Sequence, residues 1–155
     1  MSLASEVVSA LAGRTLSTAE SLTGGGIGAA ITGIPGSSVV FKGGVISYTN
    51  EIKHRILKVD AAVLDGCGAV SAPVAEQMAA GARVLMETDF AVSVTGLAGP
   101  GGDEYGNPVG TVYIGFSDGK RVFSRRFHFT GDREAVRRQT GEEALRLILE
   151  QLETE

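Results

Sequence analysis

The sequence has few of the side chains that build metal sites and disulfides. Its 155 residues include one cysteine, Cys67, and two histidines, His54 and His128. One cysteine cannot form an internal disulfide, and these three side chains cannot supply a zinc cluster. The acidic residues are scattered, whereas magnesium chemistry usually needs grouped carboxylates. We therefore expect neither a metal nor a cofactor, and a core of ordinary size must hold the fold.

The sequence also lacks any apolar run near the length of about 20 residues that spans a bilayer. Its first residues, MSLASE, do not show the charged and then apolar pattern of a signal peptide. We therefore expect a cytoplasmic protein with no membrane partner. The length predicts one domain over residues 1–155.

Charge is unevenly distributed along the chain. The formal net charge is −4, which argues against a protein that binds nucleic acid non-specifically. Half of the 14 basic residues nevertheless fall within residues 120–138. This concentration favours a small anionic partner, although a solvated hairpin and helix face would explain the same pattern.

Helical and extended patterns alternate along the first two thirds of the chain, and a hairpin pattern follows. The predicted fold is a single three-layer α/β/α domain with a mixed sheet, whose antiparallel part comes from residues 109–129. The small residues of the helix predicted over 24–32 favour a homodimer. Helices are predicted over 3–12, 24–32, from 50, over 60–65, from 71 and over 132–152, and strands over 15–18, 39–48, 90–95, 109–116 and 122–129.

A glycine-rich turn, TAESLTGGG over 18–26, joins the first strand to the second helix. Ser21 lies at this corner and is our candidate nucleophile, because unpaired N–H groups and the helix dipole favour an anion there. The N–H groups of Thr23, Gly24 and Gly25 could then receive a developing oxyanion. A serine before a glycine run is also a common N-cap, which would need no chemistry.

A second strand-to-helix junction carries Tyr48, Asn50 and Lys53. Asn50 is the expected helix cap, and such junctions gather along one rim of an α/β sheet. Lys53 lies in the first helical turn, where the dipole and partial burial would lower its pKa. A neutral lysine could serve a serine as its base, whereas most lysines are simply solvated.

A third group of residues suits an anion. The loop 96–102 has four glycines in seven residues and follows a buried strand that ends at Thr95, so its N–H groups could face a ligand. Arg133, near a third junction, could pair with a phosphate there. A flexible turn is the alternative. Neither His54 nor His128 is placed by its element to serve Ser21.

Six ordered blocks resemble the CinA C-terminal domain family, whose stand-alone members are nicotinamide-nucleotide amidases. The blocks are TAESLTGG (18–25), GGVISYTNEIK (43–53), GAVS (68–71), VTGLAGPGG (94–102), PVGTV (108–112) and GDREAVRRQ (131–139). The resemblance implies hydrolysis of the carboxamide of nicotinamide mononucleotide, which yields nicotinic acid mononucleotide and ammonia. It places the family's nucleophilic serine and lysine on Ser21 and Lys53, and its other site residues near Tyr48, Thr95 and Arg133.

The resulting hypothesis has Ser21 attack the amide carbon, Lys53 move the proton and Tyr48 orient or relay. Substrate contacts are assigned to the N–H groups after Ser21 and to residues at the three junctions. These substrate-binding candidates are Thr23, Gly24, Gly25, Asn50, Thr95, Gly96, Gly99, Gly101 and Arg133. The alternative function is a non-catalytic nucleotide- or phosphate-binding module; a nucleotide pyrophosphatase fits less well because it needs clustered carboxylates.

The chain departs from the family in two places. Leu22 stands where many members have cysteine, so that thiol is not needed for the proposed chemistry. An acidic pair, Asp103 and Glu104, lies in a loop that is irregular in the family. Many relatives carry a large N-terminal domain that this sequence does not include, so functions of that domain are not carried over.

Overall fold

The computed structural model describes residues 1–154 and has a mixed five-stranded sheet at its centre, with strand order β2-β1-β3-β4-β5. β1 runs parallel to β2 and to β3, whereas β4 is antiparallel to β3 and β5 is antiparallel to β4. The mixed sheet and its late antiparallel hairpin are therefore confirmed. The strands are β1 (Leu16–Glu20), β2 (Phe41–Ile46), β3 (Phe90–Gly96), β4 (Thr111–Ser117) and β5 (Val122–His128).

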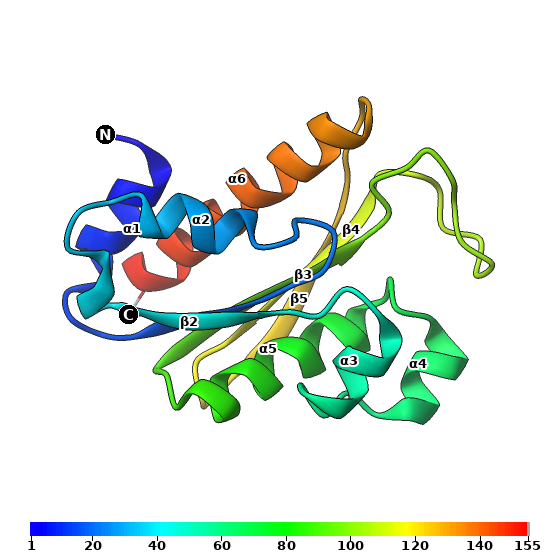
Figure 1. Cartoon of the computed structure of the whole chain (residues 1–155), viewed down its shortest axis with the longest axis horizontal. Coiled ribbons are helices and arrows are strands. Elements are labelled where there is room, and N and C mark those ends of the chain that lie inside the picture. The colour runs from blue at the N-terminus through cyan, green and yellow to red at the C-terminus, as the bar shows by residue number, and fades with distance from the viewer. Residues whose placement is uncertain (155) are drawn as a thin grey trace.

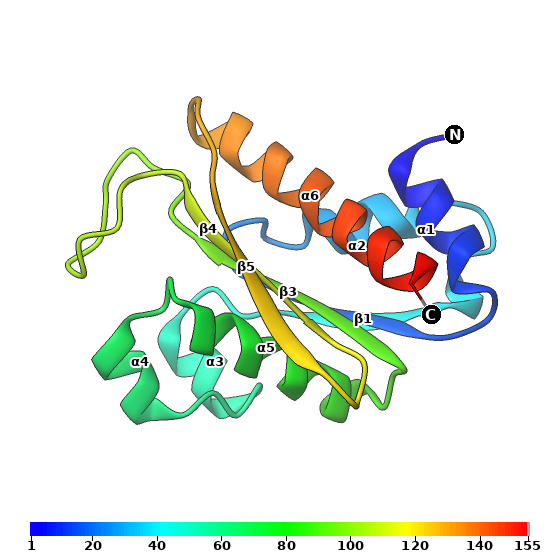
Figure 2. The same ribbon diagram turned by 180° about the vertical axis from the view of Figure 1, so that it is seen from behind.

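Helices cover both faces of the sheet and make three layers (Figure 1). The helices α1 (Leu3–Leu11), α2 (Gly26–Thr32) and α6 (Arg133–Glu153) lie on one face. The long helix α5 (Ala72–Met86) covers the other, with the short helices α3 (Asn50–Arg55) and α4 (Ala61–Cys67) beyond its N-terminal end. Figure 2 shows the same layers from behind, with β5 at the free edge of the sheet.

The core has two parts, one on each side of the sheet. The larger part joins α1, α2 and α6 to the sheet through Leu11, Ile31 and Ile148, and the smaller part packs Val74 and Met78 of α5 against the sheet. β1 is buried at every position because helices cover both of its faces. Strands covered on both faces show no alternation of apolar and polar residues, and LSTAE shows none, although Ser17, Thr18 and Glu20 make this buried strand partly polar.

Several element boundaries differ from the predictions. α2 begins at Gly26, two residues late, because Gly24 and Gly25 adopt left-handed φ angles of +60° and +99°. The cap of α3 is Thr49 rather than Asn50, since the Thr49 hydroxyl accepts the Ile52 N–H. Strand β2 is shorter than predicted because a short 3₁₀ helix, Ser37–Val39, precedes it. The β-bulge is confirmed, and it falls one residue before the predicted glycine pair, where Leu16 pairs with Phe41 and Ser17 with Gly43.

Gly115 of β4 lies where α5 crosses the sheet. A Cβ atom there would lie 2.4 Å from the Ala75 carbonyl oxygen and 2.4 Å from the Ser93 hydroxyl. Gly115→Ala should therefore lower the free energy of unfolding by about 1–3 kcal/mol, the usual cost of overpacking. Denaturant titration measures the change. Gly141→Ala is the matched control because its Cβ would meet nothing within 4 Å, and equal stability of the two variants would contradict this packing argument.

No helix among residues 1–154 is both long and apolar enough to cross a membrane.

Candidate active site

Ser21 lies directly after β1, a central strand of the sheet. Its N–H donates to the Val94 carbonyl of β3 at 3.1 Å, so the backbone stays attached to the sheet up to this residue. Its carbonyl then accepts the Gly24 N–H at 3.1 Å, which closes a tight turn. Only 7% of Ser21 is exposed. The sheet and the turn therefore fix the hydroxyl at the carboxyl end of β1.

Lys53 brings its ammonium group to Ser21 from α3. Nζ lies 3.0 Å from the Ser21 Oγ, 2.8 Å from the Ser47 carbonyl oxygen and 3.4 Å from the Tyr48 carbonyl oxygen. The residue is 1% exposed, and within residues 1–154 no carboxylate forms an ion pair with it. Burial lowers the pKa of Lys53 from 10.5 to about 8. Lys53 is therefore not the solvated surface lysine considered above.

The three oxygens around Nζ match both protonation states of the lysine. A charged ammonium has three N–H groups, one for each oxygen. A neutral amine can donate to the carbonyls of Ser47 and Tyr48 and still turn its lone pair toward the Ser21 hydroxyl. This arrangement can remove the serine proton and return it.

Glu20 occupies the start of α2. Its carboxylate is buried and accepts hydrogen bonds from the Thr23 hydroxyl at 2.7 Å and from the N–H groups of Ile27 and Gly28, both at 2.9 Å. The N-cap residue of α2 is Gly25. The alternative role of Ser21 as the cap of α2 is therefore wrong. The prediction that the first helical N–H groups are open to an anion is also wrong, because Glu20 binds them.

Tyr48 and Arg133 meet across the opening of the site. Arg133 donates through Nη2 to the Tyr48 hydroxyl at 3.1 Å and through Nη1 to the Gly99 carbonyl at 2.7 Å. Tyr48 reaches Lys53 through its backbone carbonyl. In the described chain its hydroxyl has no hydrogen bond to Ser21 or Lys53, so the expected relay through the phenol is not seen.

These residues surround one pocket of about 500 Å³. Most of the candidates from the sequence line it, and they come from all three junctions. The lining includes Ser21, Tyr48, Asn50, Lys53, Thr95, Gly96, Gly99, Gly101 and Arg133. The Thr95 hydroxyl is already donated to the Ala69 carbonyl at 2.8 Å, so it helps to join β3 to the segment before α5.

Thr23, Gly24 and Gly25 are not part of that lining. The Thr23 hydroxyl turns to Glu20, Gly24 lies beside the Arg137 guanidinium, and Gly25 lies beside the Ile46 side chain. The Thr23 side chain and the two glycines therefore do not form the pocket wall. Local spacing cannot show this, because it depends on where α6 and β2 lie.

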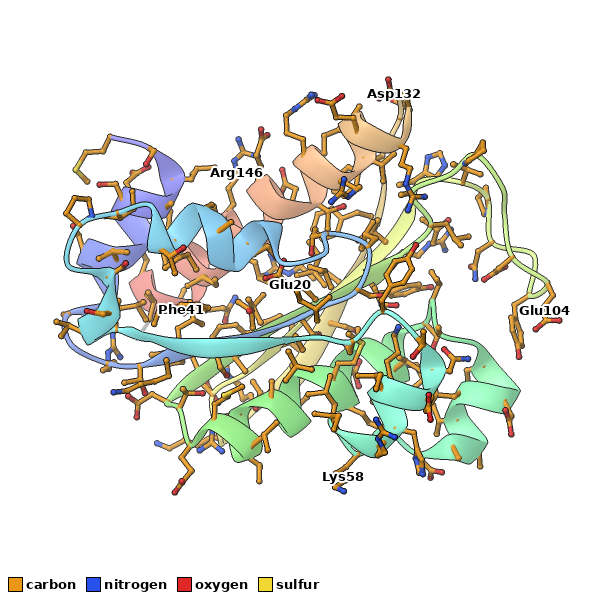
Figure 3. All side chains as sticks on the ribbon, in the orientation of Figure 1. Glu20, Phe41, Lys58, Glu104, Asp132 and Arg146 are labelled. Carbon is orange, nitrogen blue, oxygen red and sulfur yellow. The ribbon has the colours of Figure 1, made fainter. Side chains whose placement is uncertain are left out.

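Part of the pocket wall is formed by residues that were not individually predicted as site residues. The additional lining residues are Leu22, Ala69, Val70, Leu97, Ala98, Asp103, Glu104 and Tyr105. Tyr105 fastens the loop between β3 and β4 by donating to the Asp65 carbonyl at 2.7 Å. Figure 3 shows Glu104 at the outer tip of this loop. Only the loop's position after a buried strand could have indicated its place at the rim.

Neither histidine lines the pocket, in agreement with the sequence analysis. A ring nitrogen of His54 is 2.8 Å from the Val59 carbonyl, and one of His128 is 3.1 Å from the Val109 carbonyl. Among the described residues, no three His, Cys, Asp or Glu side chains are grouped to hold a metal ion.

Comparison with known proteins identifies the family. The model of the CinA C-terminal domain matches residues 1–152. The chain is 51% identical over 140 residues to nicotinamide-nucleotide amidohydrolase PncC of Pseudomonas putida, covering 90% of this chain and 87% of that protein. It is 50% identical to a CinA-like protein of Parasynechococcus marenigrum; this match covers 90% of the chain but 34% of that longer protein.

Solved structures agree in fold. A CinA superfamily protein of Klebsiella pneumoniae superposes with a TM-score of 0.96 at 35% identity, covering 99% of this chain and 97% of that one. A competence/damage-inducible protein of Agrobacterium tumefaciens gives a TM-score of 0.92 at 39% identity, with 97% and 93% covered. The chain therefore belongs to the CinA C-terminal domain family.

Proposed function

We propose that this protein is a nicotinamide-nucleotide amidase that converts nicotinamide mononucleotide to nicotinic acid mononucleotide and ammonia. The observation that carries the proposal is the 3.0 Å contact between the Ser21 Oγ and the buried Lys53 Nζ at the wall of a nucleotide-sized pocket. The 51% identity to an amidohydrolase of the same substrate class supports it.

In the proposed mechanism, neutral Lys53 takes the Ser21 proton as the serine oxygen attacks the carboxamide carbon. The tetrahedral intermediate collapses when Lys53 gives that proton to the leaving nitrogen, so ammonia departs and an acyl-serine remains. Water then attacks the acyl carbon while Lys53 takes its proton. Return of the proton to Ser21 restores the enzyme and releases the product as a carboxylic acid, which then loses its proton to water.

Backbone N–H groups after Ser21 are the candidate donors to the oxyanion. The Gly24 N–H is already bonded to the Ser21 carbonyl. Within residues 1–154 the N–H groups of Leu22 and Thr23 form no hydrogen bond, and Leu22 lines the pocket. We therefore expect these two N–H groups to be the donors, so that Thr23 is kept from the predicted set and Leu22 takes the place of Gly24.

The rest of the pocket suits a phosphorylated ribose. Among the described residues Arg133 is the one arginine in its lining, and its guanidinium contacts Tyr48 and Gly99. A guanidinium can grip a phosphate dianion through two N–H groups. Asn50, Thr95 and the glycine loop would lie along the ribose. The pocket volume falls in the usual range for small-ligand sites, about 300–1,000 Å³.

The direct test is ammonia release from nicotinamide mononucleotide with EDTA present. Formation of nicotinic acid mononucleotide and ammonia in equal amounts would support the amidase. Binding of nicotinamide mononucleotide without turnover would instead support the non-catalytic binding module.

Arg133→Ala should raise KM for nicotinamide mononucleotide by about 10- to 100-fold, as expected for the loss of a charge-assisted contact. KM for nicotinamide riboside should change far less, because this compound has no phosphate. Steady-state kinetics with both substrates measures the difference. Arg138→Ala is the control, since within residues 1–154 Arg138 pairs only with Glu142 on the helix surface. Equal losses for both substrates would show that Arg133 does not bind the phosphate.

A further inference from the structure

Arg137 contacts the turn that carries the nucleophile. Its Nε donates to the Leu22 carbonyl at 2.9 Å, and its Nη2 donates to the Thr23 carbonyl at 3.3 Å. The residues are far apart in sequence, so α6 must lie against the turn for these bonds to form. Arg137 belongs to the basic segment 120–138, for which a solvated helix face was one explanation, and these contacts show that this explanation does not hold for Arg137.

The two bonds restrain the backbone just after Ser21. Because each peptide unit is planar, fixing the carbonyls of Leu22 and Thr23 also fixes the direction of the N–H groups of Thr23 and Gly24. Before the turn, the Ser21 N–H is bonded to Val94 of β3. Ser21 is therefore held between the sheet on one side and α6 on the other.

Acidic residues of the same helix do not pair with Arg137. Glu134 and Glu142 both lie on α6, but it is Arg138 that pairs with Glu142, at 3.8 Å. In the part of the chain that the structure describes, Arg137 forms no ion pair. It does not line the substrate pocket either. Its charge is directed at the two turn carbonyls, which argues against a role in gripping the phosphate.

We propose that Arg137 is a positioning residue that holds the Ser21 turn so that the hydroxyl stays within reach of Lys53. The inference rests on the proposed function only in taking Ser21 as the nucleophile. Arg133 lies four residues earlier on the same helix face. The start of α6 would thus hold both the substrate phosphate and the nucleophile turn in one rigid frame.

The first experiment measures how fast a fluorophosphonate probe labels Ser21, because this rate reports serine reactivity without any nucleotide. Arg137→Met should slow labelling by about 10- to 100-fold, since small displacements of a reacting group are costly. With nicotinamide mononucleotide, kcat should fall by a similar factor while KM changes little. Arg138→Met, the neighbouring exposed arginine, should match the parent chain. Equal labelling of Arg137→Met and the parent would overturn the proposal.

The second experiment separates positioning from general stability. Arg137→Ala removes the side chain, and added guanidinium should restore much of its labelling rate by binding where the arginine group lay. A thermal unfolding curve of Arg137→Ala checks that the variant is folded at the assay temperature. Slow labelling without rescue, together with a lower Tm, would show a merely structural role and overturn the proposal.

The probe also separates this inference from the amidase assignment. The probe could label Ser21 of the parent at a rate that depends on Arg137 while no ammonia is released from nicotinamide mononucleotide. That result would contradict the proposed substrate and support the positioning role. A parent chain that the probe does not label would overturn the positioning role, because Ser21 would then not be a reactive nucleophile.

Discussion

Ser21→Ala is expected to lower kcat by about 10³- to 10⁶-fold, as removal of the nucleophile does in serine hydrolases. The methyl group cannot form the acyl intermediate, and Lys53 loses only one of its three oxygen partners. Ammonia release measures kcat, and calorimetry should show that nicotinamide mononucleotide still binds with an affinity close to that of the parent.

Ser124→Ala is the control for loss of a serine hydroxyl. Ser124 lies on β5, outside the pocket, and its hydroxyl donates to the Glu76 carboxylate of α5, so activity should be kept. Turnover of Ser21→Ala near the parent rate would refute the acyl-serine mechanism. Loss of both binding and turnover would point instead to a collapsed site.

Much of the fold could be predicted because helices and strands leave different periods in the sequence. The hairpin around Asp118 and the capped helix after Asp132 are local patterns, and both formed as expected. Strand order is not local. No periodicity shows that β1 lies between β2 and β3, although this arrangement brings Ser21 beside Val94.

The candidate site was partly predictable for the same reason. β1, β2 and β3 are parallel, so the residues that follow their carboxyl ends meet at one rim. Tyr48 and the glycine loop were therefore found from strand ends alone. Glu20 and Arg137 were missed because each acts on the turn from the side, one from within β1 and the other from α6.

The burial of Lys53 could be anticipated only in part. Its place near a helix start predicted a pKa lowered by the dipole and by partial burial, and in the structure the cause is removal from water. Whether a lysine on a short helix is buried depends on the elements packed around it. Here 1% exposure makes the difference between a surface charge and a candidate base.

Lys53→Met is expected to reduce kcat/KM by at least about 10²- to 10⁴-fold, the usual contribution of a general base. In the parent, kcat/KM should rise with pH through the Lys53 pKa of about 8, because only the neutral amine accepts the serine proton. Two pH units below that value, about 1% of the lysine is neutral, so the rate should be about 100-fold below its plateau. A pH–rate profile measures both effects.

His54→Gln and His128→Gln are the controls for the base. Both should keep the rise of kcat/KM with pH on the acidic side of the profile (the acidic limb), because neither ring lines the pocket.

The pH dependence of stability gives an independent readout. The pKa of Lys53 is about 8 in the folded protein, below its ordinary value of 10.5. Between about pH 8 and 10.5 the unfolded chain therefore binds more protons than the folded one. The free energy of unfolding of the parent should rise with pH over that interval. Lys53→Met should lack this rise and remain folded at pH 7. If a histidine variant removes the acidic limb, or Lys53→Met keeps it, Lys53 is not the base.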